Sequence, residues 1–184
     1  METTGPGAGA AAAPAPAPPA ATARPAAEHA VAVRHNFETA HRLPHLAGKC
    51  ENLHGHSWWA EVTVTAPRLA EGTVVEFGSF KAGLRSWIDT QLDHGAMLGS
   101  ADPLAKLLPD HGCKVFRFGA ADPRPAERFA RDLAYPTVEA VAELVARVAA
   151  DLLAALPCAP GARVSAVCVS ETHVNTAQWR ETAR

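Results

Sequence analysis

Alternation of apolar and polar residues predicts two β-strands in the first half of the chain. The stretch from Ala30 to Glu38 alternates with a period of two, and so, more clearly, does the stretch from His54 to Ala66. A period of two is typical of a strand with one buried face. One face of the second strand carries His54, His56, Trp58, Ala60, Val62 and Val64.

Two further stretches follow a helical period. Apolar residues from Phe80 to Leu92 recur at i, i+4, i+7 and i+8, with Ser79 as a candidate N-cap and Gly95 beyond the expected end. A second helix is predicted from the N-cap Thr137, which follows Pro136, to about residue 155.

The last part of the chain predicts two more strands, over residues 163–171 and 177–181. Residues 96–134 contain several Pro and Gly residues and one short strand-like piece, 114–118, and we interpret them as an insertion. The order ββααββ predicts an α+β fold, a four-stranded antiparallel sheet with two helices on one face. Both edges of such a sheet would be open, which favours a homo-oligomer.

Composition divides the chain into a tail and one domain. Residues 1–28 are almost entirely Ala, Pro, Gly and Thr, which predicts a disordered tail, and residues 29–184 are predicted to form the domain. A net charge of −2 gives no reason to expect nucleic acid, and no apolar run is long enough for a membrane span. Four cysteines without framework spacing, and no secretory signal, favour a cytoplasmic protein with reduced thiols.

The candidate chemistry is concentrated between His41 and His56. His54 and His56 are two residues apart, so both imidazoles leave the same face of a strand, and His41 could supply a third nitrogen. Three histidines with a fourth position open are typical of a catalytic zinc site. By spacing alone, His35 or His45 could replace His41. Cys50 could be a catalytic thiol or the fourth zinc ligand.

Six motifs follow one another in a fixed order along the chain. They are His35-Asn-Phe-Glu-Thr-Ala-His41-Arg-Leu, Cys50-x3-His54-Gly-His56, Val75-Glu76-Phe77-Gly-Ser-Phe-Lys81, Leu92-Asp93-His94, Pro136-Thr137-Val-Glu139 and Glu171-Thr172. This ordered set resembles the 6-pyruvoyl-tetrahydropterin synthase / 6-carboxytetrahydropterin synthase family. The similarity covers roughly residues 30–181 and is interrupted by the insertion.

The resemblance implies a tunnelling (T-) fold whose subunits form trimers, commonly stacked into a hexamer. It implies zinc as the metal and 7,8-dihydroneopterin triphosphate as the substrate, from which triphosphate is eliminated. The implied zinc ligands are His41, His54 and His56; the implied catalytic residues are Cys50, Asp93 and His94; Glu171 is the implied pterin anchor. Thr137 is an N-cap and, through its backbone, a candidate substrate contact.

The expected activity is that of a zinc-dependent lyase forming 6-carboxy-5,6,7,8-tetrahydropterin for 7-deazapurine (queuosine-type) synthesis. Formation of 6-pyruvoyl-tetrahydropterin is the alternative on the same substrate. A non-catalytic pterin-binding or structural zinc domain, with Cys50 as the fourth ligand, is a second alternative. The chain departs from many members at Glu76, Ser57 and Leu98-Gly99, which affects the choice of product rather than the zinc site.

Overall fold

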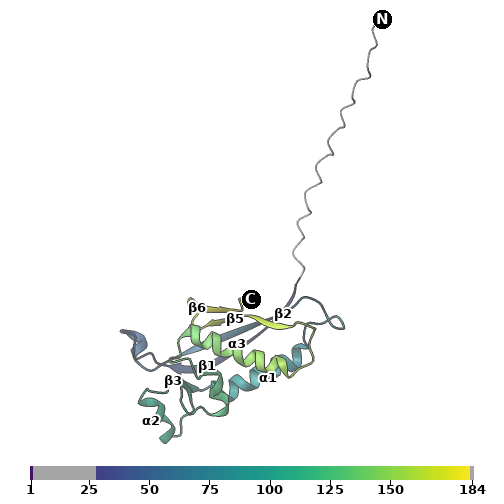
Figure 1. The fold of residues 1–184 in the computed structure, drawn as a ribbon. Helices are drawn as coiled ribbons and strands as arrows, with labels where there is room; N and C mark the ends of the chain where they lie inside the picture. The colour runs from purple at the N-terminus through teal and green to yellow at the C-terminus, as the bar shows by residue number, and fades with distance from the viewer. Residues whose placement is uncertain (2–27, 183–184) are drawn as a thin grey trace.

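A six-stranded sheet forms the centre of the computed structural model, which describes Met1 and residues 28–182. Helices α1 (Phe77–Gln91) and α3 (Val138–Ala154) lie across the sheet, and α2 (Leu104–Asp110) lies near β3 (Figure 1). The spatial order is β4-β3-β1-β2-β5-β6. The strands are β1 (His29–His41), β2 (His54–Ala66), β3 (Gly95–Gly99), β4 (Val115–Phe118), β5 (Arg163–Ser170) and β6 (Thr176–Arg180).

The long hairpin of β1 and β2 confirms the two strands predicted from alternation. Its antiparallel register runs without a break from the pair His29 and Ala66 to the pair His41 and His54. The predicted inner residues of β2 are fully buried from Trp58 to Val64 at every second position. β1 continues three residues beyond its predicted end, so His41 is the last residue of a strand.

The prediction of four antiparallel strands is wrong, although the α+β class is confirmed. β3 and β4 come from the predicted insertion and are parallel, β3 to β1 and β4 to β3. Alternation does not detect such strands because parallel strands covered on both faces are apolar throughout. Ala96, Met97 and Leu98 are indeed all buried. The strand-like piece at 114–118 is confirmed as β4.

The two long helices begin at different kinds of cap. α3 starts as predicted, with the Thr137 hydroxyl accepting a hydrogen bond from the Ala140 N–H. α1 starts earlier than predicted because Glu76, rather than Ser79, is its N-cap; the Glu76 carboxylate accepts from the N–H groups of Gly78 and Ser79, both at 2.6 Å. A carboxylate there also favours the positive end of the helix dipole.

Two other sequence predictions concern the tail and the membrane. The predicted tail, residues 1–28, lies almost wholly outside the described residues. Among the helices of residues 28–182, none combines the length and apolar character needed to cross a bilayer.

A buried carboxylate holds together the segment that was predicted as an insertion. Glu127, in the short 3-10 helix η2 (Pro125–Ala130), is only 1% exposed. It accepts hydrogen bonds from the guanidinium groups of Arg117, on β4, and Arg124. Burial alone would raise the pKa of Glu127, but these hydrogen bonds outweigh it and lower the pKa from 4.5 to about 2.

Replacing Glu127 with glutamine is expected to lower the free energy of unfolding by about 3 kcal/mol at neutral pH, because two guanidinium groups lose their buried counter-charge. A carboxylate with a lowered pKa in the folded state stabilises it above the unfolded pKa, and this stabilisation is lost as pH falls from 4.5 toward 2. The difference between the two proteins should therefore shrink on acidification. Urea unfolding of both proteins at several pH values measures this difference in the free energy of unfolding.

Glu143→Gln, which removes a partly exposed partner of Arg147, is the matched control. Its expected loss of unfolding free energy is below about 1 kcal/mol. Equal losses in the Glu127 and Glu143 variants would contradict this role of Glu127.

Candidate metal centre

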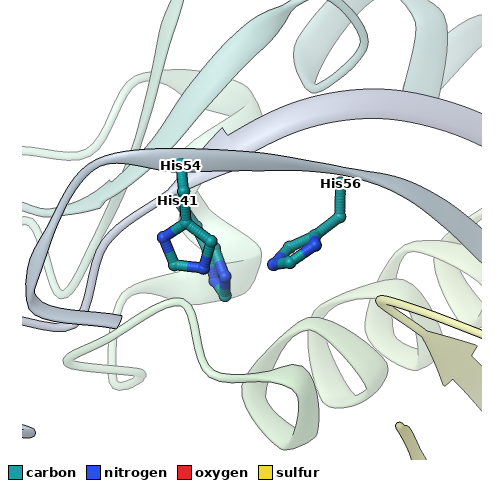
Figure 2. Close-up of side chains that lie close together, drawn as sticks. All are labelled: His41, His54 and His56. Atoms are coloured by element: carbon teal, nitrogen blue, oxygen red, sulfur yellow. The ribbon is translucent and has the colours of Figure 1, made fainter. Parts of the chain in front are cut away.

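Three imidazoles converge at the end of the β1–β2 hairpin where the connecting loop joins the two strands. His41 ends β1, His54 begins β2, and the register places them directly opposite each other. His56 lies two residues farther along β2 on the same face. One ligand atom from each ring lies within 4.8 Å of the others, and Figure 2 shows the three rings on the same side of the two strands. The predicted triad is therefore brought together.

Backbone carbonyls fix the orientation of two of these rings. His41 Nδ1 donates to the Pro136 carbonyl at 2.9 Å, and His54 Nδ1 donates to the Asn52 carbonyl at 2.8 Å. A carbonyl oxygen only accepts, so the proton is on Nδ1 and the lone pair of Nε2 is free to bind a metal.

The unpartnered nitrogens of the triad fit a metal ion. His41 Nε2 and His56 Nε2 are both buried and have no hydrogen-bond partner within the described chain. Burial of an unpaired polar atom is costly, so such atoms require explanation. Burial, together with the neighbouring imidazoles, also lowers the pKa of His41 and of His56 below the usual value, which favours the neutral, metal-binding form. The three histidines could hold an ion with a coordination position left open.

The structure also decides between the alternative histidines. His35 Nε2 is 2.7 Å from an Asp89 carboxylate oxygen on α1, and the His45 ring stacks on Tyr135 with 3.8 Å between ring centroids. Neither belongs to the group of mutually close ligand atoms. The geometry therefore selects His41, which spacing alone did not.

Cys50 lies in the loop that joins the two ligand-bearing strands. It is part of the 3-10 helix η1 (Lys49–Glu51), is half-buried, and is a free thiol. Its carbonyl accepts from the Leu43 N–H at 2.7 Å, which folds the loop back toward the end of β1. The group of mutually close ligand atoms among the described residues consists of the three histidines without Cys50.

Glu171 lies directly beside the triad. It follows the last residue of β5, and its Oε2 is 3.7 Å from His41 Nε2. Its other carboxylate oxygen accepts a hydrogen bond from Asn175 at 3.2 Å. Sequence reasoning identified Glu171 but did not place it next to a metal ligand, because this contact depends on the pairing of β2 with β5.

Asp93 and His94 form a pair in the turn between α1 and β3. The Asp93 carboxylate is 2.7 Å from His94 Nδ1 and also accepts from the Glu38 N–H. Burial would raise the pKa of Asp93, but these hydrogen bonds lower it below its usual value. The His94 side chain is 78% exposed. The pair is thus formed against the backbone of Glu38, and neither of its residues belongs to the group of mutually close ligand atoms.

Thr137 contacts the centre only indirectly. It caps α3 and follows Pro136, whose carbonyl orients the His41 ring. The cap thus fixes the backbone that positions a metal ligand.

A cleft of about 660 Å³ opens next to the triad. Residues His56 and Glu171 line it together with residues on the outer face of β2. The lining residues are Arg34, Gly55, His56, Ser57, Trp59, Ser170, Glu171, Thr172 and His173.

The fold and the site define an α+β protein with an open three-histidine centre at the end of a long hairpin. The sequence profile described as 6-pyruvoyl tetrahydropterin synthase matches residues 30–182, and the chain belongs to this family.

Bacterial proteins named 6-carboxy-5,6,7,8-tetrahydropterin synthase match parts of this chain. A 6-carboxy-5,6,7,8-tetrahydropterin synthase from Rickettsia bellii is 37% identical over 86 residues, 45% of this chain and 62% of that protein. The protein of the same name from Synechocystis sp. is 44% identical over 64 residues, 32% of this chain and 50% of that protein. The matches thus span between half and two thirds of these relatives.

Solved structures share the fold. A 6-pyruvoyltetrahydropterin synthase from Plasmodium vivax, described as an alanine mutant of a catalytic glutamate, aligns with a TM-score of 0.56 and 16% identity over 85% of this chain and 99% of that one. At this identity the similarity establishes the architecture alone.

Proposed function

We propose that the protein is a zinc-dependent lyase that converts 7,8-dihydroneopterin triphosphate and water to 6-carboxy-5,6,7,8-tetrahydropterin, with loss of triphosphate and of the two outer side-chain carbons as a two-carbon aldehyde, in a 7-deazapurine (queuosine-type) pathway of the cytoplasm. The main support is one observation: two imidazole nitrogens of the triad are buried and unpartnered, and one of them, His41 Nε2, lies 3.7 Å from the Glu171 carboxylate. The names of the bacterial relatives favour the 6-carboxy product.

His41, His54 and His56 would hold the zinc ion. Bound zinc supplies a Lewis acid for the hydroxyl groups of the substrate side chain, which makes neighbouring C–H and O–H bonds more acidic. The carbonyls of Pro136 and Asn52 keep two of the ligands in the required tautomer.

Glu171 would bind the pterin ring. Its two oxygens suit the paired N–H groups of an amino-pyrimidine edge, as a carboxylate suits other forked donors. Asn175 holds one oxygen, and the 3.7 Å separation from His41 keeps the bound ring next to the metal centre.

Cys50 would remove the carbon-bound proton. A thiol does so as the thiolate, which nearby cations favour. A second candidate base is adjacent, since Glu51 is exposed in the same 3-10 helix and a glutamate is named as catalytic in the P. vivax enzyme. Paired variants of the two residues separate them, as described below.

Asp93 and His94 would transfer protons, with Asp93 fixing the tautomer of His94. Because the His94 side chain is 78% exposed and is not among the mutually close ligand atoms, a second copy of the chain is the natural source of the pair at each centre. This supports a homo-oligomer, proposed as a hexamer of two trimers, in which the edge strands β4 and β6 find partners.

Incubation with 7,8-dihydroneopterin triphosphate and Zn²⁺, followed by mass analysis of the pterin product, tests the proposal. We expect a product with one side-chain carbon, the carboxyl group. A product that keeps all three side-chain carbons would establish the 6-pyruvoyl alternative. Bound zinc without any pterin product would favour the non-catalytic alternative.

A further inference from the structure

The cleft next to the metal centre contains an arginine that none of the roles above uses. Arg34 projects from β1 onto the outer face of the sheet, where its guanidinium carbon lies 4.3 Å from the centre of the Trp59 ring. Both residues line the cleft with His56 and Glu171. Trp59 is 39% exposed, which is unusual for a large aromatic residue in the middle of a sheet and leaves its ring as a surface of the cleft.

The Arg34 guanidinium has no anionic partner in the described part of the chain. Other arginines hold a carboxylate, as Arg117 and Arg147 do. The register places Glu61 opposite Arg34, yet no ion pair forms between them within 4.0 Å. A guanidinium stacked on an aromatic ring keeps its N–H edge free in the plane of the group, which suits bidentate binding of phosphate.

The position along the cleft fits the tail of an elongated ligand. Trp59 is three residues from His56, about 10 Å along β2. Gly55, which has no side chain, and the hydroxyl residues Ser57 and Thr172 line the same cleft. The cleft therefore contains both Glu171, whose Oε2 is 3.7 Å from His41 Nε2, and the cation of Arg34, a charge pattern that matches a heterocycle with N–H donors and an anionic tail.

We propose that Arg34, held flat on Trp59, forms the subsite for the phosphate chain of the substrate and determines preference for the phosphorylated pterin. This rests on the proposed function for the identity of the ligand. Arg34 is exposed, so its replacement leaves the core intact.

Titration of the purified protein with inorganic tripolyphosphate, followed by calorimetry, tests the subsite directly. Arg34→Gln should weaken the binding of tripolyphosphate about tenfold or more, because a charge-assisted hydrogen bond is removed. The affinity of Arg34→Lys for tripolyphosphate should lie between those of Arg34→Gln and the unchanged protein. Since tripolyphosphate also binds zinc, the loss must appear in both metal-loaded and metal-free protein. Arg85→Gln, on an exposed face of α1, is the matched control and should bind as the unchanged protein does.

Steady-state kinetics with 7,8-dihydroneopterin triphosphate gives the second readout. Arg34→Gln should raise KM about tenfold with kcat nearly unchanged, since the phosphate chain is bound in the ground state as well as in the transition state. Equal tripolyphosphate binding by Arg34→Gln and the unchanged protein, or an equal loss in Arg85→Gln, would overturn the subsite even if turnover is observed. Arg34-dependent tripolyphosphate binding in a protein that converts no substrate would instead overturn the proposed function and keep the anion site.

Discussion

Cys50→Ala is expected to lower kcat by about 10²- to 10⁴-fold, the range typical for loss of a general base. Zinc content should stay near one ion per chain, because Cys50 is not among the mutually close ligand atoms. Thermal stability should also be retained, since Cys50 is only half-buried in a short loop. Metal analysis, thermal unfolding and steady-state turnover on the same preparation measure all three. Cys113→Ala, at another free and exposed thiol, is the matched control and should leave all three unchanged.

Two other outcomes for Cys50→Ala would change the assignment. Loss of zinc together with stability would make Cys50 a fourth ligand and the centre structural. Retained turnover in Cys50→Ala, combined with a collapse in Glu51→Gln, would assign the base to Glu51. The double variant of Cys50→Ala and Glu51→Gln is also informative. If the two residues act as one unit, the double variant loses no more turnover than either single variant does.

His54→Ala is expected to abolish stoichiometric zinc binding and, with it, turnover. The side chain is half-buried at the start of β2, so its removal opens no cavity in the core. Two nitrogens and water form a much weaker site than three fixed imidazoles, and loss of even an outer-shell partner costs about 10- to 100-fold in metal affinity. The variant should therefore unfold at the temperature of the metal-free unchanged protein, because bound metal stabilises only the folded state.

His45→Ala is the matched control for this experiment. His45 lies in the same loop region and stacks on Tyr135, but it is outside the triad. The His45→Ala variant should keep the zinc content of the unchanged protein, near one ion per chain. Loss of zinc in His45→Ala with retention in His54→Ala would contradict the assignment of the ligands.

The hairpin and most of the triad could be predicted from the sequence because their signals are local. β2 alternates clearly enough that both of its bounds were predicted, and two histidines on one strand face must point the same way. The spacing of the histidines alone could not decide whether His41, His35 or His45 is the third ligand. The choice depends on the length of β1 and on the register that pairs His41 with His54, which no local pattern encodes.

The remaining features depend on contacts between distant segments. β3 was missed because a strand buried on both faces does not alternate, and the parallel pairing of β4 with β3 is a contact between separate segments. The contact of Glu171 with His41 follows from the pairing of β2 and β5. The direction of the Asp93–His94 pair depends on the left-handed backbone of His94, with φ of 54°, in the turn between α1 and β3. Helix periodicity predicts where α1 ends but not how the next two residues turn.

Release of inorganic triphosphate from 7,8-dihydroneopterin triphosphate tests the central claim most directly. Zinc-loaded protein should release one triphosphate per pterin converted, and protein stripped of metal should release none until zinc is restored. Triphosphate release that is the same with and without metal would contradict a role for the His41–His54–His56 centre. No release by zinc-loaded protein would contradict the lyase assignment itself.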